Sequence, residues 1–100
     1  MPTTLADLTA YLETCLSPGS DSDYCPNGLP VEGRDRVARL VTGVTACQAL
    51  LDAAVACDAD AVLVHHGYFW RGEDPTVVGM KRRRLATLLD SGVSLLAYHL

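Results

Sequence analysis

The sequence lacks several features that would mark a membrane, secreted or nucleic-acid-binding protein. No apolar stretch approaches the roughly 20 residues that a membrane-spanning helix requires. A secretory signal is also missing, because Asp7 and Glu13 interrupt the apolar residues near the N-terminus. Basic residues are scarce: 8 Lys and Arg stand against 12 Asp and Glu, a net charge of -4, whereas nucleic-acid binding needs a basic face. We therefore expect a cytoplasmic protein that binds neither membranes nor nucleic acid.

Closely spaced cysteine pairs are absent as well. The four cysteines, at positions 15, 25, 47 and 57, form no Cys-x-x-Cys motif. An even number can indicate disulfides in a secreted protein, but without a signal we expect reduced thiols. Cys47 and Cys57 fall inside or at the end of a predicted helix, where a free cysteine behaves as a small apolar residue. Cys25 lies in a predicted loop and remains a candidate nucleophile.

The chain has the length and composition of one small globular domain. It contains 100 residues, of which 49% are hydrophobic and 20% charged. Leucines at three- and four-residue spacing predict an amphipathic helix over residues 3–16, which Ser17-Pro18-Gly19 ends. Residues 20–33 are rich in Ser, Asp, Pro, Asn and Gly, so we expect a surface loop with a short extended piece at 29–31.

Strand and helix patterns alternate in the rest of the chain. Strands are expected at 37–42, 61–64 and 93–98, and helices at 46–57 and 76–89. Thr45 and Gln48 fit a capping box for the first of these helices, and Asp74 with Pro75 fits the start of the second. This order predicts an α/β layered fold: a mainly parallel sheet flanked by helices, β-α-β-α-β after an N-terminal helix.

Two of the three histidines are adjacent, His65 and His66, directly after the apolar run 61–64. His99 follows the last predicted strand. The carboxyl ends of parallel strands share one edge of a sheet, so we expect all three histidines there, near Thr42 and the residues that follow it. Imidazole is a common metal ligand and also an acid–base group. The sequence therefore predicts a metal site or an acid–base site, with ordinary loop histidines as the alternative.

A shared metal site needs the two adjacent rings to converge. Successive side chains of a strand point to opposite faces, but Gly67 would let the backbone bend directly after the pair. The two rings could then face one metal, or each could hold one ion of a pair about 3.5–4 Å apart. Further candidate donors are the carboxylates of Glu32, Glu73 and Asp74.

The sequence allows two interpretations of the role of each of three other segments. Residues 43–45 could form an anion-binding nest or a structural turn. The basic run Lys81-Arg82-Arg83-Arg84 could be a solvated or subunit-contacting helix face, or could recognise phosphate. The aromatic run 68–70 could wall a site and exclude water, or could pack in the core.

Five segments also resemble a known family. They are residues 24–33 (YCPNGLPVEG), 42–46 (TGVTA), 59–70 (ADAVLVHHGYFW), 81–85 (KRRRL) and 97–100 (AYHL). Together they make nearly the whole chain similar to the dinuclear-metal-centre proteins labelled GTP cyclohydrolase I type 2 homologues, the NIF-three-like group. The chain departs from the family pattern at Pro30, where glutamine is usual.

The resemblance implies roles for the three histidines. His65 and His66 correspond to metal ligands of the family, which holds two divalent ions per full-length subunit, and His99 would lie near the metals. An aspartate just beyond Leu100, and a histidine and a glutamate nearer the C-terminus, complete the family's ligand set. We therefore expect residues 1–100 to be a single domain, the N-terminal part of a longer family member. Zn, Fe, Mn or Mg would suit such ligands.

The resemblance also implies a function. It indicates a metal-dependent hydrolase acting on a nucleotide or another small molecule, with the full-length protein assembled as a homohexamer. The alternative is a metal-handling or regulatory metal-binding protein without catalysis, because the sequence contains no recognisable nucleotide-specific motif.

Overall fold

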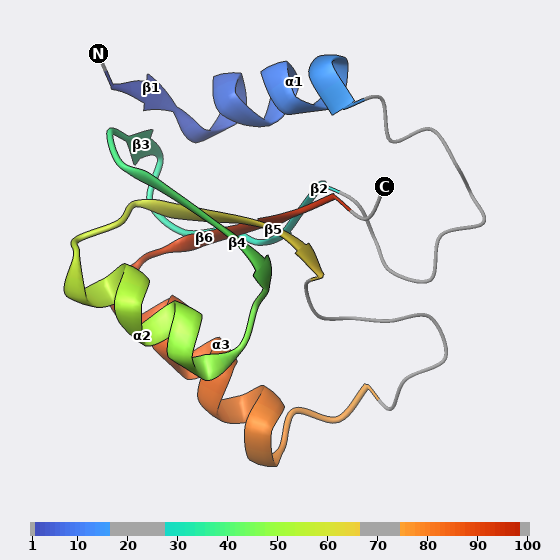
Figure 1. Cartoon of the computed structure of the whole chain (residues 1–100), viewed down its shortest axis with the longest axis vertical. Helices are drawn as coiled ribbons and strands as arrows, with labels where there is room; N and C mark the ends of the chain where they lie inside the picture. The colour runs from blue at the N-terminus through green and yellow to red at the C-terminus, as the bar shows by residue number, and fades with distance from the viewer. Residues whose placement is uncertain (1, 17–27, 67–74, 99–100) are drawn as a thin grey trace.

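Figure 1 shows the computed structural model of the chain, which describes residues 2–16, 28–66 and 75–98. A four-stranded sheet lies between helix α1 on one face and helices α2 and α3 on the other (Figure 1). None of the helices in these ranges is long and apolar enough to cross a membrane. The elements in chain order are β1 (Thr3–Thr4), α1 (Leu5–Leu16), β2 (Gly28–Val31), β3 (Arg36–Val37), β4 (Leu40–Thr45), α2 (Gln48–Ala56), β5 (Ala61–His66), α3 (Gly79–Ser91) and β6 (Ser94–Ala97).

The sheet confirms the predicted α/β class and its mainly parallel character. Its strand order is β2-β6-β5-β4; β4 and β6 both pair parallel with β5, and β2 pairs antiparallel with β6. The predicted β-α-β-α-β unit is β4-α2-β5-α3-β6. Its two crossovers step in the same direction across the sheet, so connections of the same hand place α2 and α3 on the same face. The small β1–β3 pair was not predicted, since Thr3 and Thr4 were assigned to the helix.

The first predicted strand of this unit has different bounds. Residues 37–42 divide between β3 and β4, and β4 continues to Thr45. The division falls where the Asp60 carboxylate accepts the N–H groups of Ala38 and Arg39 and so turns the chain. Because Thr45 ends a strand, the predicted capping box is wrong: Cys47 is the N-cap of α2 and makes no side-chain capping bond.

The start of α3 was also predicted too early. The helix begins at Gly79 after the extended N-cap Val78, and Pro75 precedes it outside the helix. Val77 and Val78 are β-branched, which lowers helix propensity and favours extended backbone. Asp74, the predicted cap, lies outside the described residues. The helix continues two residues beyond the predicted bound of 89 and ends at Gly92, whose φ of 70° is the left-handed conformation that glycine adopts readily.

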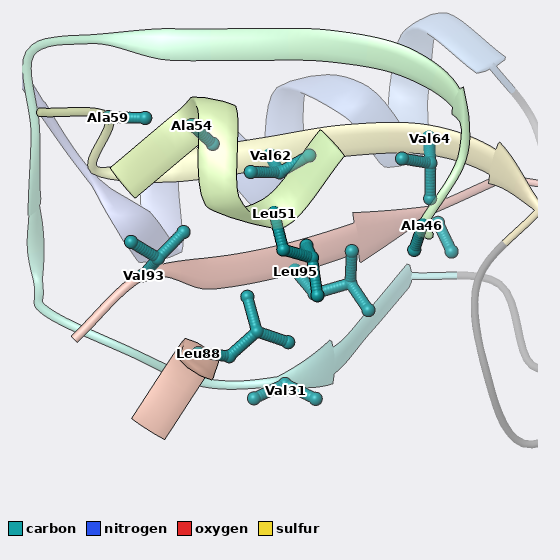
Figure 2. Close-up of a cluster of buried hydrophobic side chains, with 11 residues drawn as sticks. Val31, Ala46, Leu51, Ala54, Ala59, Val62, Val64, Leu88, Val93 and Leu95 are labelled. Carbon is teal, nitrogen blue, oxygen red and sulfur yellow. The ribbon is translucent and has the colours of Figure 1, made fainter. Parts of the chain in front are cut away.

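Two hydrophobic clusters hold the layers together. The larger cluster fills the space between the sheet and α2 and α3, with Leu51, Leu88 and Leu95 at its centre (Figure 2). The smaller cluster, which includes Leu12 and Leu96, lies between the sheet and α1. Leu95 and Leu96 are successive residues of β6 on opposite faces, so this strand is buried from both sides.

Asp60 joins several segments at the amino edge of the parallel strands. Its carboxylate accepts the Ala38 N–H at 2.8 Å, the Arg39 N–H at 3.0 Å and the Arg34 guanidinium at 2.9 Å. Its own C=O accepts the N–H of Ser94, the first residue of β6, at 3.1 Å. The hydrogen bond from Ala38 contributes most to lowering the pKa of Asp60 below its ordinary value of 3.8, with Arg39 and Arg34 acting in the same direction.

This network predicts the effect of Asp60→Asn. An amide cannot accept all three donors as an ionised carboxylate does, so we expect the free energy of unfolding near neutral pH to fall by about 1–3 kcal/mol. Because the pKa of Asp60 is lowered in the folded state, its ionised carboxylate stabilises the fold at pH values above the ordinary carboxyl pKa. This stabilisation is lost as the pH falls through the pKa of the folded state. The difference between the two proteins should therefore shrink below about pH 4. Urea unfolding across pH measures it.

Asp58→Asn is the matched control for Asp60→Asn. Asp58 is exposed in the same turn, and its φ of 58° is one that asparagine tolerates. We expect a change within about 0.5 kcal/mol for this variant. Equal losses at both positions, or an Asp60 effect that does not depend on pH, would contradict the account.

Candidate metal centre

His65 and His66 are the last two residues of β5 and are both half-buried. They were predicted to follow the strand, but they belong to it. Their ring centroids lie 4.3 Å apart with an interplanar angle of 74°, an edge-to-face contact. The rings therefore meet although they come from successive residues of a strand. The predicted bend at Gly67 lies outside the described residues.

Neighbouring strands position the backbone of this pair. Thr45 at the end of β4 is in register with His66, and the next residue, Ala46, donates its N–H to the C=O of His66 at 2.9 Å. On the other side of β5, the N–H of Tyr98 bonds to the C=O of Val64 at 3.0 Å. The histidines thus lie at the carboxyl edge of the three parallel strands, as predicted. His99, expected at the same edge, lies outside the described residues.

Residues 43–45 form neither the nest nor the turn that we considered, because they belong to β4. Packing explains why residue 43 is a glycine: a Cβ at Gly43 would lie 2.5 Å from the side chain of Leu50. Gly43 therefore lets α2 approach the sheet closely. The helix then starts directly beside the histidine edge.

Glu32 is not a neighbour of the histidines, and its prediction as a candidate ligand is wrong. It follows β2, which runs antiparallel to β6, and Val31 pairs with Leu95. The N–H of Gly33 donates to the Oγ of Ser94, the first residue of β6, at 2.8 Å. Glu32 thus lies at the amino edge of the parallel strands, at the opposite end from His66. The other candidate donors and the aromatic run lie outside the described residues: Cys25, residues 68–70, Glu73 and Asp74.

The cysteines that the structure describes do not complete a site with the histidines. Cys15, Cys47 and Cys57 are free thiols. Cys57 is at the opposite end of α2 from the histidine edge, where its thiol donates to the C=O of Ala54 at 3.4 Å. Cys47 is half-buried at the helix N-cap rather than inside the helix.

The basic run of α3 divides into two kinds of position. Arg82 and Arg83 are exposed, whereas Lys81 and Arg84 are half-buried. Lys81 and Arg84 share the helical stripe of Leu88, which is buried in the core. Half of the run therefore faces solvent and half turns towards the body of the protein.

The donors present fit a divalent transition metal in type but not in number. Two neighbouring imidazoles suit zinc or iron, and carboxylate ligands would be needed to favour manganese or magnesium. A closed structural zinc site needs four protein ligands, and a catalytic one usually has three. Among residues 2–16, 28–66 and 75–98, no group of three or more His, Cys, Asp or Glu side chains could hold a metal ion. The described residues thus bring together two candidate donors, fewer than a complete metal site needs.

Tyr98 connects the histidine edge to α1, a contact that sequence reasoning missed. The residue is 3% exposed, and its hydroxyl donates to the Oε1 of Glu13 at 3.4 Å. Burial, followed by the charge of Glu13 and this hydrogen bond, raises the pKa of Tyr98 from 10.0 to about 12. The two residues are 85 positions apart, so no local spacing pattern indicates the contact.

Comparison with known proteins finds relatives that match nearly the whole chain. Residues 3–100 match the family model described as Duf34/NIF3 (NGG1p interacting factor 3). A Pseudomonas aeruginosa protein named "GTP cyclohydrolase 1 type 2 homolog" is 63% identical over 100 residues, which are all of this chain and 40% of that protein. The chain thus spans well under half the length of this relative.

Two solved structures are similar in fold and in sequence. One, titled protein ybgI of unknown function, has a TM-score of 0.93 and 52% identity, covering 97% of this chain and 39% of its own. The other, the protein TTHA1606 from Thermus thermophilus, has a TM-score of 0.92 and 36% identity, covering 98% and 40%.

The raised pKa of Tyr98 predicts its titration. Comparing wild type with Tyr98→Phe by tyrosinate absorbance isolates this residue, and we expect the difference to appear near pH 12 rather than near 10.0. Because the pKa of Tyr98 is raised in the folded state, its protonated hydroxyl stabilises the fold fully at pH values below the pKa of the unfolded state. This stabilisation is lost as the pH rises to the pKa of the folded state, here between pH 10 and about 12. A difference titrating at the ordinary value would contradict the buried placement.

Proposed function

The chain belongs to the Duf34/NIF3 family, and on that premise we propose that His65 and His66 are ligands of a centre for two divalent metal ions. The observation that carries the proposal is the contact of the two imidazole rings, with centroids 4.3 Å apart. Nitrogen donors this close can serve one ion or two neighbouring ions.

The position of the pair in the sheet supports the same proposal. In open α/β sheets, ligands bind outside the carboxyl ends of the strands. The backbone of His66 is fixed there by the bond from Ala46, and that of Val64 by the bond from Tyr98. Ordered backbone on both sides reduces the conformational freedom that metal binding would otherwise remove. We place His99, which directly follows Tyr98, near the same ions.

We propose hydrolysis of a nucleotide or another small molecule as the activity of the centre. A pair of divalent ions would lower the pKa of a bridging water and polarise the substrate. His65 and His66 would hold the ions, and the buried Tyr98 would keep the end of β6 beside them. GTP is the first substrate to test, because the Pseudomonas aeruginosa relative is named "GTP cyclohydrolase 1 type 2 homolog".

The second candidate function is metal handling or regulation without turnover. It is supported by the sequence, which contains no recognisable nucleotide-specific motif. The two histidines would then bind a metal ion and pass it to a partner without turning over a substrate.

The complete metal centre is proposed for a longer polypeptide. The relatives are longer than this chain, which covers 40% of the first of them. An aspartate beyond Leu100, and a histidine and a glutamate further on, would complete the ligand set there. We also propose that this longer polypeptide assembles as a homohexamer and is located in the cytoplasm.

The first prediction is that the chain binds zinc through both histidines. With so few donors, we expect fewer than two ions per chain by elemental analysis after dialysis. Loss of one imidazole by His65→Ala or His66→Ala should weaken binding by at least about tenfold in a calorimetric titration with ZnCl₂. The double variant should bind no zinc in the same range.

Cys57→Ala is the control for zinc binding. It removes another soft donor at the opposite end of the sheet, so we expect unchanged affinity. Equal zinc content in wild type and in the double histidine variant would reject the proposed metal site and with it both functions.

The second prediction separates hydrolysis from metal handling. If the centre is catalytic, the metal-loaded protein should release product from GTP or a related nucleotide at a rate that His65→Ala abolishes. No turnover above that variant, together with transfer of the metal to an acceptor protein that depends on both histidines, would establish metal handling instead. Chromatography of the nucleotides and metal analysis of the acceptor provide the two measurements.

A further inference from the structure

Half of the basic residues of this acidic chain are gathered in one short segment. Four of the 8 Lys and Arg residues are consecutive, Lys81-Arg82-Arg83-Arg84, although the net charge of the chain is -4. They lie in the first two turns of α3. Clustered cations raise the local electrostatic potential and attract anions to that part of the protein. The place of these turns in the fold therefore determines where an anion would bind.

Helix α3 begins on the side of the sheet where the histidines lie. It connects β5 to β6, which are parallel, so the chain must return along α3 from the carboxyl edge to the amino edge. The end of the helix has this position, because the C=O of Gly92 accepts the N–H of Arg34 at 2.9 Å, and the Arg34 guanidinium binds Asp60 at the amino edge. The basic run, near the start of α3, is therefore towards the carboxyl edge.

The start of α2 connects the basic helix to the histidines. The Nε2 of Gln48, the first residue of α2, donates to the Oγ1 of Thr87 at 2.9 Å. Two residues earlier, the N–H of Ala46 donates to the C=O of His66 at 2.9 Å. Two residues of chain span at most about 7 Å, so α3 and the histidine edge are close at this point. The orange first turns of α3 extend from there beyond the start of α2 (Figure 1).

The four cations do not face the same way. Lys81 and Arg84 are half-buried, and the Nε of Arg84 is fully buried, whereas Arg82 and Arg83 are exposed. The Nη2 of Arg84 donates to the Sδ of Met80 at 3.4 Å, one turn nearer the start of the helix. The guanidinium thus extends along α3 towards the carboxyl edge, in the direction in which helical side chains tilt. Arg84 and Lys81 are therefore the two cations of the run on the inner side of the helix.

We propose that Lys81 and Arg84 bind the phosphate groups of the substrate of the metal centre. A guanidinium can donate two parallel hydrogen bonds to phosphate oxygens, and the ammonium of Lys81 adds a point charge one turn away. Two cations match an anion with several charges, such as a chain of phosphates, better than a single carboxylate. The inference rests on the proposed function for the position of the reacting part of the substrate, and it restricts the substrates to phosphorylated molecules.

The test compares anion binding by variants that lose the same charge. Calorimetric titration of the metal-free protein with sodium tripolyphosphate measures phosphate binding without a base, a ribose or a metal ion. We expect Arg84→Gln and Lys81→Gln each to weaken this binding by at least about tenfold. Arg82→Gln is the matched control, because it removes one positive charge from an exposed neighbouring position; we expect a change within about twofold. Circular dichroism verifies that each variant is folded.

Further titrations separate this inference from the metal centre itself. Arg84→Gln should weaken the binding of GTP but not of guanosine, which has no phosphate, and it should bind zinc as the unchanged protein does. His65→Ala should instead weaken zinc binding and leave tripolyphosphate binding unchanged. A protein that binds tripolyphosphate through Arg84 but binds no zinc would keep the anion site and reject the metal centre. Absence of tripolyphosphate binding, equal losses in Arg82→Gln and Arg84→Gln, or equal losses for GTP and guanosine would overturn the inference.

Discussion

The parallel pairing of β5 with both of its neighbours is the constraint on which the rest of the structure depends. Because β4, β5 and β6 run in the same direction, their carboxyl ends meet at one edge, and the histidines at the end of β5 lie between Thr45 and Tyr98. The helices on the two faces of the sheet cover β5 and β6, and both strands contribute to the larger cluster (Figure 2) and to the smaller one. Strand direction therefore determines which residues lie at this edge.

The two ends of the parallel strands have different chemistry. At the amino end, one carboxylate, Asp60, accepts hydrogen bonds from both the β3–β4 turn and Arg34, and Arg34 also donates to the C=O of Gly92 at 3.2 Å. These bonds fix the connections around the sheet. At the carboxyl end, the described side chains include two adjoining imidazoles that could bind metal ions. The fold thus separates the residues that hold the strands together from those that we propose act on a ligand.

Much of the central fold could be predicted from the sequence, because strong local patterns specify it. The apolar run before His65 and the glycine after α3 both have local physical causes, burial on two faces and a left-handed helix end. The contacts that the sequence does not indicate join distant segments. A short extended piece is predicted at 29–31 and is part of β2, but its antiparallel pairing with β6 is a tertiary contact. For the same reason Glu32 was placed at the wrong edge, and the Tyr98–Glu13 contact was not foreseen.

The measurement that tests the central claim most directly is anomalous diffraction from a crystal of the chain soaked in zinc. Our account predicts an anomalous peak within about 2.0–2.1 Å of a ring nitrogen of His65 or His66, with both rings facing the bound metal. Strong zinc peaks elsewhere with none at this pair, or rings turned to opposite faces of β5, would contradict it.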